Sequence, residues 1–252
     1  MDPRVAIISD RLKSIKKIIA IAAGKGGVGK STIATGLALV LSQLGYKIGL
    51  LDLDFYGPSS HVILGLSEEI QPREERGIVP PTVHGIELMS LVFYTGKNPT
   101  PLRGPDLTNA LIELLAITRW GDLDFLIVDM PPGMGETTLD AIRFLKNPSF
   151  LIVTTPSRVA HETVGKLLAL LSELNIAILG VLENMRRSSD RARSSFGVRV
   201  VGELPFDEGL EDALGDPERF LQTEFAQRLR EIASAIFPLP EPQASPPPSL
   251  RL

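Results

Sequence analysis

Short apolar runs alternate along the chain with segments in which apolar side chains recur every three or four positions. Continuous apolar runs are typical of parallel strands covered on both faces, and the three-to-four spacing is typical of helices with one buried side. The predicted strands are 18–23, 47–52, 86–93, 125–129, 150–154, 176–183 and 198–204. The predicted helices are 30–44, 106–118, 136–145, 160–174, 208–214 and 220–237, with Asp106 as the expected N-cap of the second.

This alternation predicts an α/β fold of a single domain. Strands and helices that follow one another in this way are joined by right-handed crossovers, so we expect a doubly wound, mostly parallel sheet flanked by helices. Residues 1–17 are predicted to form a lead-in helix and residues 18–237 the domain itself. Residues 238–252 contain six prolines and are expected to form a disordered tail, because such a segment has little to bury.

A glycine-rich loop follows the first predicted strand. Residues 24–32 read GKGGVGKST, which matches the phosphate-binding pattern GxxxxGK[ST] between a strand and a helix. Backbone N–H groups of such a loop surround phosphate oxygens, the lysine supplies a positive charge, and the serine hydroxyl is a ligand for Mg²⁺. The sequence therefore predicts a P-loop NTPase fold that binds a nucleoside triphosphate and Mg²⁺. The predicted nucleotide contacts are Gly24, Lys25, Gly26, Gly27, Val28, Gly29, Lys30, Ser31 and Thr32.

Acidic residues follow two further predicted strands. Asp52 and Asp54 end the strand 47–52, and Asp129 ends the strand 125–129. The carboxyl ends of parallel strands share one edge of the sheet, so these side chains are expected beside the phosphate loop. Asp129 has the form of a Walker B acid and is a predicted Mg²⁺ ligand with Ser31 and Asp52. Asp52 is favoured as an indirect partner of the metal, and Asp54 as the residue that orients the attacking water, but spacing alone does not rank these two acids.

Composition bears on where the protein is located, which partners it binds and which metal ligands it can offer. The net charge of −4 argues against a surface built for nucleic acid, and the longest apolar runs are too short to span a membrane. The N-terminal apolar stretch is too short and too acidic for a signal peptide, so a cytoplasmic location is expected. The chain has no cysteine, which excludes disulfides and thiolate ligands from this chain.

Several motifs together resemble one known family. Lys25 is an extra lysine at the start of the loop, which is similar to the deviant phosphate loop of the MinD/ParA class. The segments LDLDFYGPS, RGP, WGDLDFLIVDMPPGMGE, TTPSRVA and GVLENM, in this order, resemble the Mrp subgroup of ATP-dependent iron–sulfur cluster carriers. The resemblance runs from about residue 12 to residue 236, nearly the whole predicted domain.

The resemblance implies roles for individual residues. Lys25 would reach across a nucleotide-sandwich homodimer to the partner's phosphates, and together with Lys30 and Asp54 it would serve catalysis. Asn184 would hydrogen-bond the edge of adenine, and the region of Pro205 would pack on the base. These assignments imply an ATPase that is gated by dimerisation and hydrolyses ATP slowly.

The chain departs from this family where the cluster would be held. Members carry a CPxC pair shortly after the ENM segment, whereas this chain continues with an arginine-rich segment, 186–199, and has no cysteine. Iron–sulfur clusters require thiolates, with at most partial replacement by histidine, and the three histidines here are scattered. We therefore expect no cluster from this chain alone, and a cysteine-bearing partner or another protein client instead. The arginine-rich segment is expected to be a solvated loop or, alternatively, a patch beside the nucleotide site that binds an anion, nucleic acid or an acidic partner.

One alternative function remains open at this level. MinD/ParA-type positioning or partition ATPases use the same deviant loop to control association with a partner, a membrane or DNA. The apolar side of the predicted helix 220–237 favours packing on the core over membrane binding, because its polar side is not rich in lysine and arginine.

Overall fold

Eight strands form one sheet in the part of the chain that the computed structural model describes, residues 2–67, 69–95, 103–190 and 196–237. The strands are β1 (Ile15–Ala23), β2 (Ile48–Asp52), β5 (Thr82–Val83), β6 (Ile86–Ser90), β7 (Leu123–Asp129), β8 (Ser149–Thr154), β9 (Ala177–Arg186) and β10 (Val200–Pro205). Their order is β10-β9-β8-β1-β7-β2-β6-β5, and β5 alone of these runs antiparallel to its neighbour. β3 (Arg73–Glu74) and β4 (Ile78–Val79) form a separate hairpin. The predicted mostly parallel sheet is confirmed.

The strand order reverses beside β1. β7 lies between β1 and β2, while β8 pairs with the other side of β1. In open α/β sheets the carboxyl end of a strand at such a reversal faces the ligand-binding crevice. The loop that follows β1 therefore lies where a ligand is expected.

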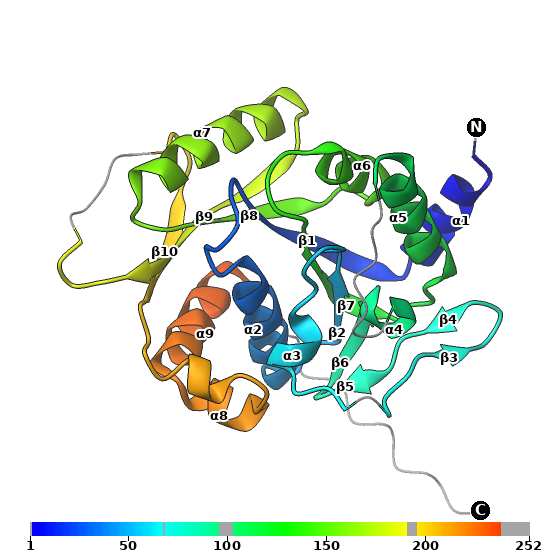
Figure 1. The fold of residues 1–252 in the computed structure, drawn as a ribbon, viewed down its shortest axis with the longest axis horizontal. Coiled ribbons are helices and arrows are strands. Elements are labelled where there is room, and N and C mark those ends of the chain that lie inside the picture. The colour runs from blue at the N-terminus through cyan, green and yellow to red at the C-terminus, as the bar shows by residue number, and fades with distance from the viewer. Residues whose placement is uncertain (1, 68, 96–102, 191–195, 238–252) are drawn as a thin grey trace, which may run out of the picture.

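Helices cover both faces of the sheet (Figure 1). The longer ones are α1 (Arg4–Arg11), α2 (Lys30–Gln43), α5 (Pro105–Ile117), α6 (Glu136–Phe144), α7 (Arg158–Glu173), α8 (Pro217–Gln222) and α9 (Glu224–Ile236), and the short ones are α3 (Ser60–Ile63), α4 (Val92–Thr95) and the 3₁₀ turn η1 (Glu211–Ala213). Alternate residues of β1 face opposite layers: Ile19 and Ile21 pack with α2, α8 and α9, whereas Ala20 and Ala22 pack with α1, α5 and α7. Burial on both faces explains why the strands are continuous apolar runs.

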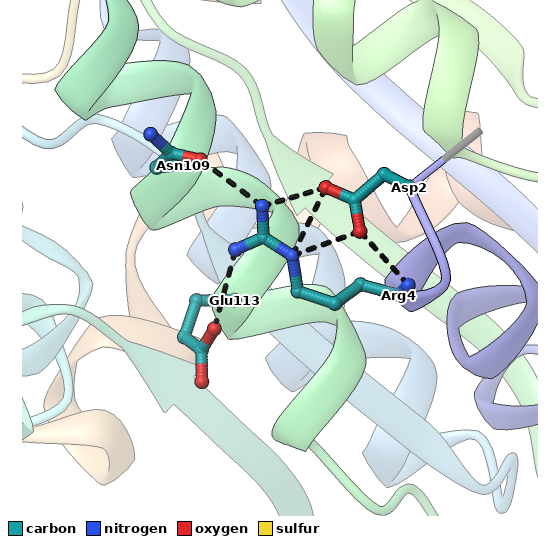
Figure 2. Close-up of polar contacts among 4 residues, drawn as sticks. All are labelled: Asp2, Arg4, Asn109 and Glu113. Atoms are coloured by element: carbon teal, nitrogen blue, oxygen red, sulfur yellow. Dashed lines mark hydrogen bonds and ion pairs between the residues drawn. The ribbon is translucent and has the colours of Figure 1, made fainter.

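The N-terminal segment is tied to α5 by one arginine. Figure 2 shows the Arg4 guanidinium between Asp2 on its own segment and Asn109 and Glu113 of α5. The Arg4 side chain binds the Asp2 carboxylate at 2.6 Å and the Asn109 carbonyl oxygen at 3.0 Å. The hydrogen bonds from Arg4 lower the pKa of Asp2 to about 2. The predicted lead-in helix is present as α1, although β1 already begins at Ile15.

Two predicted boundaries are wrong because local side-chain chemistry intervenes. The predicted strand 86–93 ends at Ser90, whose hydroxyl accepts a hydrogen bond from the N–H of Val92 and starts the turn into α4. Asp106 is not an N-cap: α5 begins at Pro105, and Asp106 lies in its first turn. A proline fits the first helical position because a residue there donates no N–H hydrogen bond within the helix, so the N–H that proline lacks is not needed.

The C-terminal helices are also shorter than predicted. The segment 220–237 is divided between α8 and α9, since the Thr223 hydroxyl accepts the N–H of Ala226 at 3.1 Å and caps a new helix. The segment 208–214 contains only the turn η1, because Asp207 accepts the N–H of Gly209 at 3.0 Å and holds the chain in a turn. The predicted tail, 238–252, lies outside the described residues.

The apolar side of α9 packs on the core. Phe225 is 1% exposed and contacts Phe220 of α8 edge to face, with ring centroids 5.8 Å apart. Leu229, Ile232 and Ala233 are buried in the same layer. Within the described ranges, no helix combines the length and apolar character that crossing a bilayer requires.

We expect Phe225→Ala to destabilise the fold by about 3–5 kcal/mol, because it removes a fully buried ring and leaves a cavity. Urea unfolding followed by circular dichroism measures this change. Ser234→Ala, at an exposed position of the same helix, is the control and should change stability by less than about 0.5 kcal/mol. An equal, small effect of both substitutions would show that α9 is not part of the core.

Candidate nucleotide-binding site

The phosphate loop connects β1 to α2 and is held close to two other elements. Gly29 has a φ of 81°, and a side chain there would also meet the Asn184 amide nitrogen at 2.3 Å. At Gly24, a methyl group would come within 2.7 Å of the backbone of Thr163 in α7. Space therefore requires glycine at both ends of the loop, and at Gly29 the backbone conformation requires it as well.

Lys30 and Asp129 form a buried ion pair at the start of α2 and the end of β7. Lys30 is 7% exposed and Asp129 is fully buried. The Lys30 ammonium also lies 3.3 Å from the Ser31 hydroxyl oxygen. Burial raises the pKa of Asp129, and the charge of Lys30 opposes that rise. The predicted lysine, serine and Walker B acid therefore lie together.

One oxygen of this cluster has no hydrogen-bond partner. Asp129 Oδ2 is buried and accepts no hydrogen bond from the residues that the structure describes. A buried carboxylate oxygen without a partner is costly, and oxygen atoms of carboxylates and hydroxyls are the ligands that Mg²⁺ prefers. The residues present thus fit a magnesium ion held by Ser31 and Asp129.

Asp52 organises the loop that follows β2. Its carboxylate accepts N–H groups from Asp54 at 3.0 Å, Ser59 at 3.2 Å and Ser60 at 3.3 Å. Asp52 is also the neighbour of Asp129 in the β2–β7 register. Burial, and then the charge of Asp129, raise the pKa of Asp52 to about 7. These three N–H bonds fit the indirect metal role better than direct ligation.

Asp54, Gly133 and Lys25 belong to three loops at the carboxyl edge of the sheet. Asp54 is half-buried at the carboxyl end of β2, and its carboxylate accepts the N–H of Gly57 at 3.1 Å. The loop after β7 approaches the phosphate loop, because the N–H of Gly133 donates to the carbonyl of Ala23 at 3.2 Å. Lys25 is half-buried and has no ion-pair partner among the described residues.

Asn184 joins the phosphate loop to a neighbouring cavity. It lies within β9, not after a strand as expected, and its amide nitrogen donates to the carbonyl of Val28 at 2.9 Å. A cavity of about 510 Å³ opens beside it. Its lining includes Gly29, Thr32, Asn184, Met185, Arg187, Pro205, Phe206, Asp207, Glu208, Leu210, Glu211, Leu214 and Phe225. The resemblance indicated Asn184 and the region of Pro205, and both line this cavity. Arg187 and Phe206 line it as well, and no motif marks them as cavity residues.

The arginine-rich segment is partly neutralised within the fold. Arg186 forms an ion pair with the buried Glu183 and another with Glu203 at 3.1 Å. Arg187 lies over the ring of Phe206. Arg191 and Arg193 lie outside the described residues. Arg186 is therefore neutralised within the fold, whereas Arg187 and Arg199 are exposed.

His161 and His84 contact different elements of the fold. His161 lies 3.5 Å from Glu183 and stacks on Phe196, while the ring of His84 contacts the carbonyl of Leu64. Among the described residues, no group of three or more histidine, aspartate or glutamate side chains is arranged to hold a metal ion by itself.

Comparison with known families agrees with this geometry. A family model described as "ParA: NUBPL iron-transfer P-loop NTPase" matches residues 14–237. The chain belongs to this family. The resemblance drawn from the motifs is thereby confirmed, and the phosphate loop is that of a P-loop NTPase.

Two sequence relatives are named iron–sulfur cluster carrier proteins. The one from Aquifex aeolicus is 39% identical in an alignment of 216 positions that covers 78% of this NTPase but only 59% of the relative. The one from Pseudomonas fragi is 38% identical in an alignment of 233 positions that covers 82% of this NTPase and 81% of the relative. The chain thus spans about three fifths of the Aquifex protein and most of the Pseudomonas protein.

Solved structures support the fold. A nucleotide-binding protein from Archaeoglobus fulgidus in complex with ADP superimposes with a TM-score of 0.68 at 30% identity, over 86% of this NTPase and 92% of that chain. The septum site-determining protein MinD from Pyrococcus horikoshii, complexed with Mg-ADP, gives a TM-score of 0.66 at 21% identity, over 88% and 96%. The MinD likeness is evidence for the fold alone.

We expect Asp52 to make the nucleotide-free, metal-free NTPase less stable as the pH rises. Its pKa of about 7 in the fold lies above the ordinary value of 3.8, so the folded state binds this proton more tightly than the unfolded state. The stabilisation is complete below the ordinary value and is lost as the pH rises through about 7.

Urea unfolding between about pH 5 and about pH 8 tests this dependence. The free energy of unfolding should fall less steeply with pH in Asp52→Asn than in the wild type. Asp122→Asn, at an exposed position, is the control and should keep the wild-type slope. An unchanged slope in Asp52→Asn would contradict the assignment.

Proposed function

We propose that this NTPase binds Mg²⁺ and ATP, hydrolyses ATP slowly as an ATP-gated homodimer, and serves the maturation of iron–sulfur proteins with thiolates supplied by a partner. The observation that carries the proposal is the buried Lys30–Asp129 pair with a free carboxylate oxygen, set between a phosphate loop and a base-sized cavity. The names of the sequence relatives support the iron–sulfur setting.

The phosphates would lie against the loop 24–29 and the first turn of α2. In a phosphate loop the backbone N–H groups bind phosphate oxygens, and the start of the helix adds partial positive charge. Lys30 would move part of its interaction from Asp129 to the β- and γ-phosphates. A bound Mg²⁺, held by Ser31 and Asp129 with support from Asp52, would neutralise phosphate charge.

Hydrolysis would depend on positioning and on charge. The transition state of phosphoryl transfer is loose, so the protein accelerates the reaction mainly by positioning the reactants and stabilising charge. A carboxylate that orients the attacking water contributes to this positioning. Asp54 is the candidate for this role, and its carboxylate is already fixed by the N–H of Gly57. Lys25 has no ion-pair partner among the described residues of its own chain, which suits a lysine that meets phosphates across a dimer. Turnover would be slow because this cation comes from the partner.

The contact between Asn184 and Val28 leaves two hydrogen-bonding groups of the amide for a base. One N–H of the amide donates to the Val28 carbonyl, so the amide oxygen can still accept and the second N–H can still donate a hydrogen bond. Adenine presents an N6 amino donor where guanine presents an O6 acceptor. The resemblance to the family indicates adenine, so we propose that the Asn184 oxygen accepts from N6, which would favour ATP over GTP.

We predict different outcomes for the two loop lysines. Lys30→Ala should abolish nucleotide binding, because it removes the charge that meets the phosphates. Lys25→Ala should keep ATP binding by the monomer but lose hydrolysis and ATP-linked dimerisation. Calorimetry measures binding, and light scattering with and without ATP measures mass.

Removing Lys30 also leaves Asp129 as an unpaired buried charge. The double variant Lys30→Ala/Asp129→Asn separates loss of folding from loss of binding, since it removes that charge and should fold without binding ATP. Tight ATP binding by Lys30→Ala would contradict the site. An unchanged mass with ATP in the wild type would contradict the dimer.

Asn184→Ala should reduce the preference for ATP over GTP by about fivefold, the equivalent of about 1 kcal/mol for one hydrogen bond to the base. Competition between the two nucleotides for the wild type and the variant measures the ratio. Asn109→Ala, at an asparagine of α5 that binds Arg4, is the control and should leave the ratio unchanged. A ratio that does not respond to Asn184 would show that the base is read elsewhere.

We predict that the purified chain holds no stable iron–sulfur cluster. Its sequence has no cysteine, and clusters require thiolate ligands. Anaerobic reconstitution with iron and sulfide, followed by gel filtration, should leave no charge-transfer absorption near about 400 nm, where thiolate-ligated clusters absorb. A stoichiometric cluster on this chain alone would restore direct carriage and remove the need for a cysteine-bearing partner.

A further inference from the structure

A histidine at the start of α7 stacks on a phenylalanine of the arginine-rich segment. The ring centroids of His161 and Phe196 are 4.4 Å apart, and the two rings are tilted by 35°. Phe196 is half-buried and packs against the apolar layer that contains α1, α5 and α7. The segment 186–199 is therefore attached to the fold near its end, as it is at its start by the ion pair of Arg186 with Glu183.

The stack keeps His161 against a buried carboxylate of β9. His161 Nε2 is buried and lies 3.5 Å from Glu183 Oε2. This nitrogen forms no hydrogen bond with the residues that the structure describes, so it does not fix the imidazole by such a bond. The Phe196 ring supplies a packing contact that holds the imidazole in place. The stack therefore fastens the first turns of α7 to β9.

The two elements joined in this way flank the phosphate loop. In α7, the backbone of Thr163 lies so close to Gly24 that a methyl group would not fit between them. In β9, the Asn184 amide donates to the carbonyl of Val28. The loop is thus held near one end by α7 and near the other by β9, and the contact between these elements bears on its conformation.

We propose that the Phe196–His161 stack couples the arginine-rich segment to the phosphate loop, so that phosphate binding and the docking of Phe196 strengthen each other. With the stack formed, α7 and β9 hold the loop in one conformation before any phosphate arrives. When Phe196 leaves, binding must also order the loop, which weakens it. The coupling is reciprocal by thermodynamic necessity. The inference rests on the proposed function, since it requires that the loop bind phosphates.

Titration with ATP and with inorganic tripolyphosphate, both in Mg²⁺, measures the effect on the loop. Phe196→Ala should weaken binding of both ligands by the same factor of about five, the lower end of ordinary coupling between sites. Phe196→Tyr keeps a ring and should bind both ligands as the wild type does. His161→Ala should act like Phe196→Ala, and the double variant should bind no more weakly than either single variant, because both substitutions remove one contact.

Phe144→Ala is the matched control. Phe144 is half-buried against the same apolar layer, but it lies at the end of α6 that leads to the start of β8, away from the phosphate loop. Its substitution should lower the free energy of unfolding, as Phe196→Ala does, and leave both affinities unchanged. An equal loss of affinity in Phe144→Ala and Phe196→Ala would show a general effect of stability and would overturn the coupling.

Trypsin measures the reverse direction of the coupling. It cleaves after arginine, and Arg199 is exposed just beyond Phe196, so mass spectrometry can follow cleavage at that residue. Tripolyphosphate in Mg²⁺ should slow this cleavage about fivefold in the wild type but not in Phe196→Ala, since cleavage follows the population of the opened segment. Cleavage that ignores the phosphate, or affinities that ignore Phe196, would overturn the coupling alone. A wild type that binds neither ligand would contradict the proposed function and the coupling with it.

Discussion

The buried ion pair between Lys30 and Asp129 is the interaction on which the rest of the site depends. Asp52 and Asp129 are neighbours across β2 and β7, and both are buried. Two carboxylates in this arrangement repel each other, and the Lys30 ammonium supplies the positive charge that offsets them. Removing one partner of such a pair costs about 3–5 kcal/mol. The pair also joins the first turn of α2 to the central strand β7, which fixes the position of the phosphate loop relative to the sheet.

Much of the fold and the centre of the site were predictable because the relevant signals are local. The loop 24–32 is a contiguous motif, and the acids directly follow apolar runs whose carboxyl ends share one edge of the sheet. Element boundaries were less predictable because single hydroxyl groups decide them. Ser90 turns the chain out of β6, and Thr223 starts a new helix where the apolar pattern continues without a break.

The cavity beside Asn184 was only partly predictable because its walls come from segments that meet through the β9–β10 pairing. Nothing in the spacing of Arg187 and Phe206 indicates that their side chains stack. The orientation of Asn184 likewise depends on a carbonyl of Val28, far away in the sequence. Charge was misleading at Arg186, which belongs to an arginine-rich segment but is bound to Glu183 and Glu203. Sequence composition counts charges, whereas only the fold shows which of them are neutralised.

The close approach of α7 to Gly24 gives the phosphate loop a mechanical linkage to the outer surface of the protein. Not even a methyl group fits between Gly24 and the backbone of Thr163, and well-packed interiors transmit strain instead of absorbing it. Any shift of α7 toward the sheet must therefore displace the residue directly before Lys25. Val159, in the first turn of this helix, is 64% exposed. A molecule that binds to the outer surface of α7 and shifts the helix would therefore move Gly24 without entering the nucleotide site.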